Sequence, residues 1–226
     1  MLTMKKTEKA RRQTKRKHGP EDATDADAPT SERAALLDFF TSTNGPKWRK
    51  RDGWSTDAPV GTWCGVTVEE GHVVALDLRR HRLAGQLPDS LGNLPSLGLL
   101  TLSGNRLTGP LPQGMARLTK LGWLWLDGNR LTGSIPDWLG NITGLTQVYL
   151  NKNQFTGSIP ASLGNLSKLF VFSMADNPLT GPVPAELGKL DGWPLNVART
   201  GVTDDFGVIE RQRERLMEQL SRPFGG

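Results

Sequence analysis

The chain has 226 residues, a formal net charge of +5 and one cysteine. Its first 20 residues hold eight Lys or Arg and one Glu, a charge of +7, so the remaining residues carry about −2 (+5 − 7). A single cysteine excludes an internal disulfide, and no apolar stretch approaches the roughly 20 residues of a membrane-spanning helix.

Residues 1–29 are predicted to form a disordered tail that is basic at first and then acidic. Charged segments with few apolar residues cannot bury enough surface to offset the entropy of ordering. The tail lacks the apolar core of a secretory signal. Its Lys/Arg run is typical of a nuclear address or a nucleic-acid contact, so we expect any nucleic-acid binding only through residues 1–20.

Residues 30–72 are predicted to cap the amino-terminal end of the fold. Ser31 is placed to cap a helix whose apolar face carries Ala35, Leu36, Phe39 and Phe40. An Asn-Gly-Pro turn follows this helix. Beyond the turn come three tryptophans, which we interpret as core residues of the cap: Trp48, Trp54 and Trp63.

Residues 73–192 consist of five stretches of 24 residues that align without gaps. Positions 1, 4, 6 and 11 are apolar in every stretch, position 13 is Gly and position 16 is Pro. No helix of constant period places apolar residues in this way, whereas a short strand followed by a turning coil does. The fixed period therefore predicts a solenoid, in which stacked neighbours bury one another's apolar faces.

Position 9 of these stretches is Asn in four cases and His in the first. A buried Asn must find partners for both ends of its amide. Stacked side chains at this position can bond the backbone of adjacent turns and form a ladder. The predicted ladder residues are His81, Asn105, Asn129, Asn153 and Asn177.

The string LxxLxLxxNxLTGxIPxxLGNL, as in residues 145–166, resembles the plant-type leucine-rich repeat. The segment around the three tryptophans is also similar to the amino-terminal caps of plant receptors and of algal and oomycete relatives. The resemblance implies an α/β repeat fold. This is a right-handed leucine-rich-repeat solenoid with a parallel concave sheet, a second short sheet, a helical amino-terminal cap and a carboxy-terminal capping helix. It also implies that the concave sheet binds a partner.

The cap departs from this resemblance in its cysteines. Secreted plant relatives usually carry two cysteines around the W-x-G-V element, but this chain has only Cys64, and Val68 stands in the second place. Because such disulfides belong to oxidising compartments, we expect a cytoplasmic or nuclear location, or a secreted one if the true amino terminus differs. With no histidine nearby in the sequence, Cys64 is interpreted as a small packing residue.

The carboxy-terminal part is predicted to close the other end of the solenoid. Residues 193–206 resemble a degenerate half-repeat, and residues 207–226 a capping helix with a short tail. Ile209, Leu216 and Leu220 lie near one face of this helix, and charged side chains occupy the other. The alternative is a helix that binds a partner.

No catalytic or cofactor-binding pattern emerges from the sequence. Its three histidines, His18, His72 and His81, have no metal-ligand spacing with Cys64 or with one another. Phosphate-binding and dinucleotide-binding glycine motifs do not occur. We therefore expect a non-enzymatic protein with no metal and no cofactor.

Side chains alternate across a strand, so positions 3, 5, 7 and 8 of each repeat should point onto the concave face. Trp123 and Trp125 of one strand and Tyr149 of the next are expected to cluster there. Exposed aromatic clusters commonly mark binding sites, although both tryptophans could instead only cover neighbouring strands. The predicted partner-binding residues are Trp123, Trp125, Tyr149, Leu99, Gln147, Val171, Asp127 and Asn151.

Three functions remain open from the sequence. The first is a monomeric intracellular module, for example in signalling, that binds a protein or peptide on its concave face. The second is a secreted or receptor-type recognition ectodomain for a peptide or glycan, or a wall-enzyme inhibitor, as the resemblance implies. The third is a nuclear protein that associates with nucleic acid through its basic tail. The concave face does not suit that role, because the charges around its aromatic cluster are of mixed sign.

Overall fold

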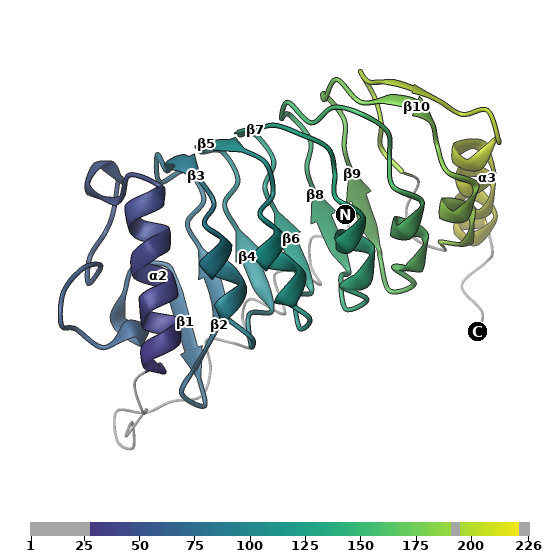
Figure 1. Ribbon diagram of the computed structural model, residues 1–226. Coiled ribbons are helices and arrows are strands. Elements are labelled where there is room, and N and C mark those ends of the chain that lie inside the picture. Colours follow the sequence, from purple (N-terminus) through teal and green to yellow (C-terminus); the bar gives the residue numbers. More distant parts are fainter. Residues whose placement is uncertain (1–27, 191–194, 222–226) are drawn as a thin grey trace.

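The computed structural model describes residues 28–190 and 195–221, so the predicted tail, residues 1–29, lies outside these ranges except for its last two residues. Helix α2 (Thr30–Ser42) closes one end of a solenoid, and helix α3 (Val208–Ser221) lies at the other (Figure 1). Short strands and 3-10 turns stack side by side between them. Among the described residues, no helix combines the length and apolar character needed to cross a bilayer.

The larger sheet has six strands in the order β1-β2-β4-β6-β8-β9. From β2 onward its strands are parallel and displaced by one repeat, so Trp123 lies between Leu99 and Gln147. The predicted solenoid with a parallel concave sheet is confirmed. Strand β1 adds an antiparallel edge that comes from the cap and not from the repeat pattern. The strand bounds are β1 Val66–Glu69, β2 His72–Asp77, β4 Leu99–Thr101, β6 Trp123–Trp125, β8 Gln147–Tyr149 and β9 Val171–Ser173.

The opposite side of each repeat combines a short strand with a 3-10 turn. The strands form two small parallel sheets, β3-β5-β7 and β10-β11. Gly109, at repeat position 13, has a φ of 75°, a conformation that residues with a Cβ rarely adopt. The Pro at position 16 precedes each 3-10 turn, and its restricted φ starts the turn at the same place each time. The bounds are β3 Ala84–Gln86, β5 Arg106–Gly109, β7 Arg130–Leu131, β10 Thr180–Pro182, β11 Gly201–Thr203, η3 Asp89–Asn93, η4 Gln113–Arg117, η5 Asp137–Asn141, η6 Ala161–Asn165 and η7 Ala185–Lys189.

The core runs the length of the solenoid. Residues at positions 1, 4, 6 and 11 are at most 5% exposed in all five repeats. Each such Leu contributes about 1.5–3 kcal/mol relative to exposure, and most of the total is offset by lost chain entropy. Because every repeat buries its neighbours' leucines, the core supports the six-stranded sheet along its whole length.

Four buried asparagines link successive repeats through the same hydrogen bonds. The Oδ1 atom of Asn129, for example, accepts from the N–H of Leu107, and its Nδ2 donates to the carbonyls of Leu102 and Leu126. Equivalent bonds are made by Asn105, Asn153 and Asn177.

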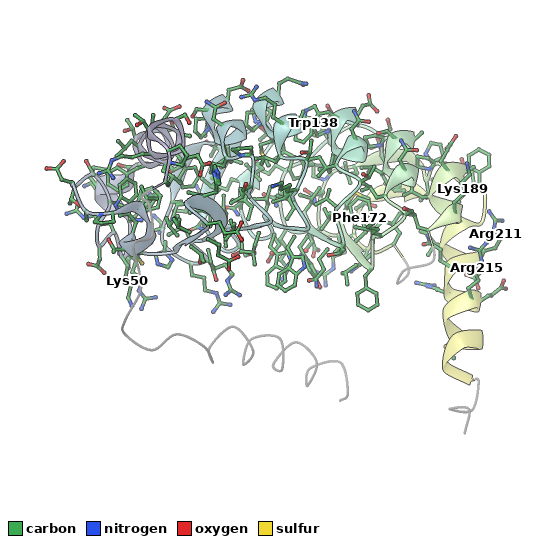
Figure 2. The ribbon with its side chains drawn as sticks, turned by 90° about the horizontal axis from the view of Figure 1, so that it is seen from below. Lys50, Trp138, Phe172, Lys189, Arg211 and Arg215 are labelled. Carbon is green, nitrogen blue, oxygen red and sulfur yellow. The ribbon has the colours of Figure 1, made fainter. Side chains whose placement is uncertain are left out.

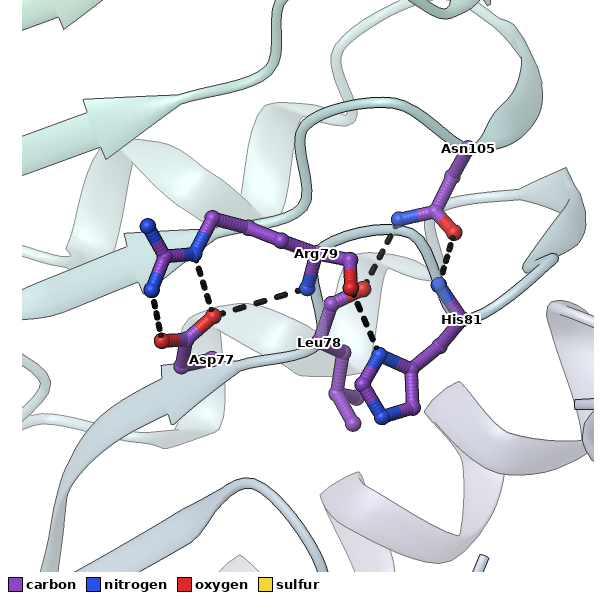
Figure 3. Close-up of polar contacts among 5 residues, drawn as sticks. All are labelled: Asp77, Leu78, Arg79, His81 and Asn105. Atoms are coloured by element: carbon purple, nitrogen blue, oxygen red, sulfur yellow. Dashed lines mark hydrogen bonds and ion pairs between the residues drawn. The ribbon is translucent and has the colours of Figure 1, made fainter. Parts of the chain in front are cut away.

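His81 differs from the ladder residue that we expected. Its ring is half-exposed, and Nδ1 lies 2.7 Å from the carbonyl of Arg79, while its backbone N–H donates to Asn105 (Figure 3). No repeat precedes the first one, and Asn105 already bonds the carbonyl of Leu78. The imidazole therefore has no preceding repeat to whose backbone it could bond, as the asparagines of the ladder do.

The amino-terminal cap is built on helix α2 and an aromatic cluster. The helix begins after Pro29, so the prediction that Ser31 caps it is wrong. The predicted apolar face is buried, and the three tryptophans of the cap are at most 5% exposed, which confirms their role in the core. The ring of Trp54 lies 4.8 Å from that of Trp48 and 5.0 Å from that of Trp63, centroid to centroid.

A buried carboxylate joins this cap to the first repeat. Glu32, on helix α2, is 1% exposed. One of its oxygens lies 2.7 Å from Nδ1 of His72, and the other accepts from the backbone N–H of Val73 at 2.7 Å. Both partners belong to strand β2, so the helix and the first strand of the repeats are tied together.

Helix α3 is attached to the last repeat by polar contacts. Asp204 accepts from the N–H groups of Val208 and Ile209 and so caps the first turn of the helix. Gln212, only 4% exposed, accepts from the N–H of Leu195 and donates to the carbonyl of Leu187. Ile209 packs against the core, while the side chains predicted to share its face, Leu216 and Leu220, lie outside the described part.

Candidate functional site

A hollow of about 890 Å³ opens on the concave face. Parallel strands end at one edge of a sheet, so residues from neighbouring strands come together there. The hollow takes the last residues of β2, β6, β8 and β9, and residues just beyond β2, β4, β6 and β8. The hollow is lined by Asp77, Arg79, Arg80, His81, Ser103, Trp125, Asp127, Tyr149, Asn151 and Ser173.

Two aromatic rings, those of Trp125 and Tyr149, line one side of this hollow, and Trp123 stacks on Trp125 outside the lining. Trp123 and Trp125 lie parallel, with ring centroids 5.8 Å apart and an interplanar angle of 3°. Tyr149 meets Trp125 edge-on at 5.5 Å and 80°. The guanidinium of Arg79 lies 5.7 Å from the Trp125 ring centroid, within cation–π range. Trp125 is thus held in place by three neighbours while its ring still borders the hollow.

The charge of Asp77 is matched by Arg79 in the same hollow. Nε and Nη2 of Arg79 donate to the two carboxylate oxygens at 2.8 and 2.6 Å (Figure 3). Burial alone would raise the pKa of Asp77, but the hydrogen bonds and the positive charge of Arg79 oppose it, and the pKa lies below its ordinary value. Asp77 therefore stays ionised at neutral pH and keeps Arg79 over the indole.

A second carboxylate lies two repeats further along the same edge. Asp127 accepts a hydrogen bond of 2.5 Å from the hydroxyl of Ser103. Burial raises the pKa of Tyr149, and the negative charge of Asp127 raises it further. The phenol therefore remains protonated at neutral pH and can donate a hydrogen bond.

Three buried polar side-chain atoms have no hydrogen-bond partner among the residues that the structure describes. They are the hydroxyl of Thr101, the indole N–H of Trp125 and the side-chain oxygen of Asn151, and the last two belong to residues that line the hollow. Most buried polar groups in proteins are paired, and an unpaired one costs free energy. Each of these atoms is closed off from solvent, so they lower the stability of this edge of the sheet and are not open contact points of the hollow.

The structure divides the predicted partner-binding residues into two rows. Trp125, Tyr149, Asp127 and Asn151 line the hollow together. The position-3 residues form a second row that is half-buried and lies farther back along the strands, outside the lining: Leu99, Trp123, Gln147 and Val171.

The prediction missed several residues of the hollow. Asp77, Arg79, Arg80, Ser103 and Ser173 stand at positions 5, 7 and 8, which the register does place on the concave face, but the list of partner-binding residues left them out. His81 also lines the hollow, although we placed it in the ladder.

Cys64 has a histidine neighbour that the sequence did not reveal. Its Sγ lies 3.9 Å from Nε2 of His81, because the cap folds back onto the first repeat. Burial raises the pKa of the Cys64 thiol, and the charges of Asp52 and Asp77 raise it further, although Lys50 opposes them. Within the described ranges, no group of three or more His, Cys, Asp or Glu side chains is arranged to hold a metal ion.

Known proteins share this architecture. The sequence model of the family described as Leucine Rich Repeat matches residues 120–142 and 144–166. No curated protein sequence matches the chain. One similar structure is the leucine-rich-repeat ectodomain of the plant membrane receptor kinase GASSHO1/SCHENGEN3 from Arabidopsis thaliana, in complex with CASPARIAN STRIP INTEGRITY FACTOR 2. It is 30% identical with a TM-score of 0.70, and the match covers 76% of this chain and 21% of that one.

Two further structures extend the comparison. A chain of the BIR3–SERK2 complex from Arabidopsis thaliana is 31% identical with a TM-score of 0.61, over 75% of this chain and 92% of that one. The plant peptide hormone receptor RGFR1, in complex with RGF2, is 34% identical with a TM-score of 0.56. The match covers 57% of this chain and 21% of that one. This chain thus spans about a fifth of the length of GASSHO1/SCHENGEN3 and of RGFR1.

These structures correct the expected location. The similar structures include the ectodomain of a membrane receptor kinase, so they point to a secreted or extracellular setting, and the expectation of cytoplasm or nucleus is wrong. That expectation depended on the missing disulfide, but the aromatic cluster around Trp54 packs the cap without one. The repeat register and the solenoid agree with the 31% identity to a chain of the BIR3–SERK2 complex, of which this chain covers 92%. The chain therefore belongs to the leucine-rich-repeat family, in its plant type.

Proposed function

We propose that this chain is a non-enzymatic recognition module that binds a protein or peptide in the hollow of its concave face. The observation that carries the proposal is the hollow itself, with the rings of Trp125 and Tyr149 in its lining and Trp123 stacked on Trp125 next to it. Aromatic side chains contribute a large share of binding energy at interfaces. In this proposal the repeats of residues 73–192 present the site, while residues 30–72, 193–206 and 207–226 close the ends.

The comparisons support a protein or peptide ligand. RGFR1 is a peptide hormone receptor, and BIR3 and SERK2 form a complex with each other. Because this chain spans only about a fifth of RGFR1, a role in signalling is part of the proposal and is not transferred from that receptor. The proposal includes that the chain acts as a monomer.

The chemistry of the site favours binding over catalysis. Cys64 and His81 form the one thiol–imidazole contact found among the described residues. The raised pKa of Cys64 disfavours the thiolate, which is the reactive form, and Cys64 does not line the hollow.

A peptide selection tests the proposal. Random peptides displayed on phage are selected on the full-length chain and then measured against a variant carrying Trp123→Ala and Trp125→Ala. We expect the selected peptides to lose at least tenfold in affinity, as hot-spot aromatics do when truncated. Phe206→Ala is the matched control, because Phe206 is an exposed aromatic (52%) that follows strand β11 of the small sheet.

The stability of the double variant separates binding from structure. Both indoles are half-buried, so we expect only a modest fall in the urea midpoint. A variant that is largely unfolded without urea would show that the tryptophans are structural. A selection that yields no binding peptide would contradict the proposed function.

A further inference from the structure

We infer that Asn141 and Asn165 are acceptor sites for N-linked glycans, on the side of the solenoid that faces away from the hollow. Each begins an Asn-X-Ser/Thr sequence, Asn141-Ile-Thr and Asn165-Leu-Ser, and no other asparagine in the sequence does. Such sequences are modified in chains that enter the secretory pathway, and the similar structures point to that setting. The inference does not depend on which ligand the hollow binds.

Both acceptor sites are open to solvent in the folded chain. Asn141 is the last residue of the 3-10 turn η5, Asn165 is the last residue of η6, and both are exposed. Thr143 and Ser167, which supply the hydroxyl groups of the two sequences, are exposed as well. A glycan is bulky and hydrated, so it has to extend into solvent. Both sites allow this without a change in the fold.

The fold does not require an asparagine at this position of the repeat. The equivalent residues of the first, second and fifth repeats are Asn93, Arg117 and Lys189. The side-chain oxygen of Asn93 accepts a hydrogen bond of 3.1 Å from Arg117. Within the described ranges, the side chains of Asn141 and Asn165 make no hydrogen bond of this kind. A sugar on either amide therefore breaks no contact that holds the solenoid together.

The modification transfers an oligosaccharide from a lipid diphosphate carrier to the asparagine. Nδ2 forms a bond with the anomeric carbon of the first sugar, and the bond between that carbon and the diphosphate breaks. Nδ2 loses one proton, and the lipid diphosphate leaves. The transferring enzyme also needs the hydroxyl of the third residue. Asn93 is followed by Leu94 and Pro95, so it lacks this hydroxyl and should stay unmodified.

The two glycans would restrict the surface that a protein partner can use. Turns η5 and η6 pack against each other in consecutive repeats, so both glycans leave from one region. In Figure 2, Trp138 of turn η5 lies toward the upper edge of the solenoid, away from Phe172 of the concave sheet. The residues that line the hollow come from the sheet side of each repeat, which stays open. A partner is thereby directed to the concave face.

Site-resolved mass spectrometry tests the inference. The full-length chain is directed into the secretory pathway of a eukaryotic host by a fused signal peptide. A peptide N-glycosidase then converts each glycosylated asparagine to an aspartate, which the spectrum locates. We expect glycans at both sites, so Asn141→Gln and Asn165→Gln should each remove one and the double variant both. Asn93→Gln is the matched control at the same repeat position and should remove none.

Three further variants test the sequence requirement while the turn is kept. Thr143→Ala and Ser167→Ala retain both asparagines but should each remove one glycan. Arg117→Asn creates an Asn-Leu-Thr sequence on turn η4 and should add a third glycan.

Peptide affinity tests which face the glycans occupy. The variant that lacks both acceptors should bind peptides selected on the wild-type chain within about twofold of the wild type. Leu99→Asn places a new Asn-Leu-Thr sequence on strand β4 of the concave sheet. Its glycan should weaken binding more than about tenfold, whereas Leu99→Gln, which creates no acceptor, should weaken it less.

The outcomes can be told apart. A chain from the secretory pathway with Asn141 and Asn165 both unmodified would overturn the inference, and a glycan at only one would overturn the other site. Chain that the host retains is measured in the same way, because the transfer takes place as the chain enters the pathway. A large loss of peptide affinity in the variant without acceptors would overturn the placement of the glycans away from the partner. A selection without any binding peptide contradicts the proposed function alone, since the mass spectrum decides the sites.

Discussion

The side-chain oxygen of Asn129 accepts a hydrogen bond of 3.0 Å from the backbone N–H of Leu107, 22 residues earlier in the chain. The same amide donates to the carbonyls of Leu102 and Leu126. One side chain thus connects two repeats behind the concave sheet. Asn129→Ala leaves the N–H of Leu107 buried without this partner, so we expect a loss of about 2–3 kcal/mol in the free energy of unfolding.

Urea denaturation followed by circular dichroism measures this loss. His81→Ala is the control, because the His81 ring lies outside the ladder and is half-exposed. It should change stability by less than about 1 kcal/mol. Equal losses in the two variants would show that the hydrogen bonds of Asn129 do not dominate the coupling between repeats.

The cap should depend on Glu32 in a similar way. Glu32→Ala removes the acceptor of the Val73 N–H, so we expect a loss of about 2 kcal/mol and faster amide exchange at Val73. Glu32→Gln keeps a side-chain oxygen and should cost less. His72→Ala serves as the control, because the His72 side chain is 47% exposed. If its effect matched that of Glu32→Ala, the contact with the His72 ring rather than the backbone bond would hold the cap.

The repeat register was readable from the sequence because it is local. Leu100, Leu124 and Val148 occupy one position of successive repeats, and each is buried beside its neighbour. The alternation of side chains across each strand also places Trp125 and Tyr149 on one edge of the concave face, where both line the hollow. Any chain with this period must stack in this order to cover its leucines.

The shape of the hollow was not readable from the sequence, because it depends on side-chain contacts between repeats. Thr101 and Ser173 share the register position of Trp125, yet they are buried, at 2% and 8% exposure. The bulk of Trp125 and Tyr149 on the strands between them hides these small side chains. The ion pair between Asp77 and Arg79 likewise depends on rotamers and not on spacing alone.

Tyr149 offers a direct test of the electrostatics of the hollow. It is the only tyrosine in the sequence, so ultraviolet titration of the phenolate reports on it alone. Burial and then the charge of Asp127 raise its pKa, so the native midpoint should lie above the ordinary value of about 10. Asp127→Asn should lower this pKa without restoring the ordinary value, because burial is the larger cause.

The sign of the pH dependence follows from this raised pKa. Below the ordinary pKa the phenol is neutral in both the folded and the unfolded chain, and the native state keeps its full stability. As the pH rises through the ordinary value toward the native one, the unfolded chain ionises first and stability falls. Asp137→Asn is the control, since Asp137 is exposed on a 3-10 turn and should leave the titration unchanged. A native midpoint at or below the ordinary value would contradict this account of the hollow.

Cys64 should be slow to react in the native protein. Burial, followed by the negative charge of Asp52, raises the pKa of its thiol, so the thiolate is scarcer at neutral pH than in an exposed cysteine. We expect iodoacetamide to alkylate the native chain more slowly than the chain in urea, with mass spectrometry counting one adduct on the one cysteine. Asp52→Asn should speed the native reaction, and Lys50→Gln should slow it, because Lys50 lowers this pKa. Native alkylation as fast as that in urea would instead mean that the contact with His81 activates the thiol.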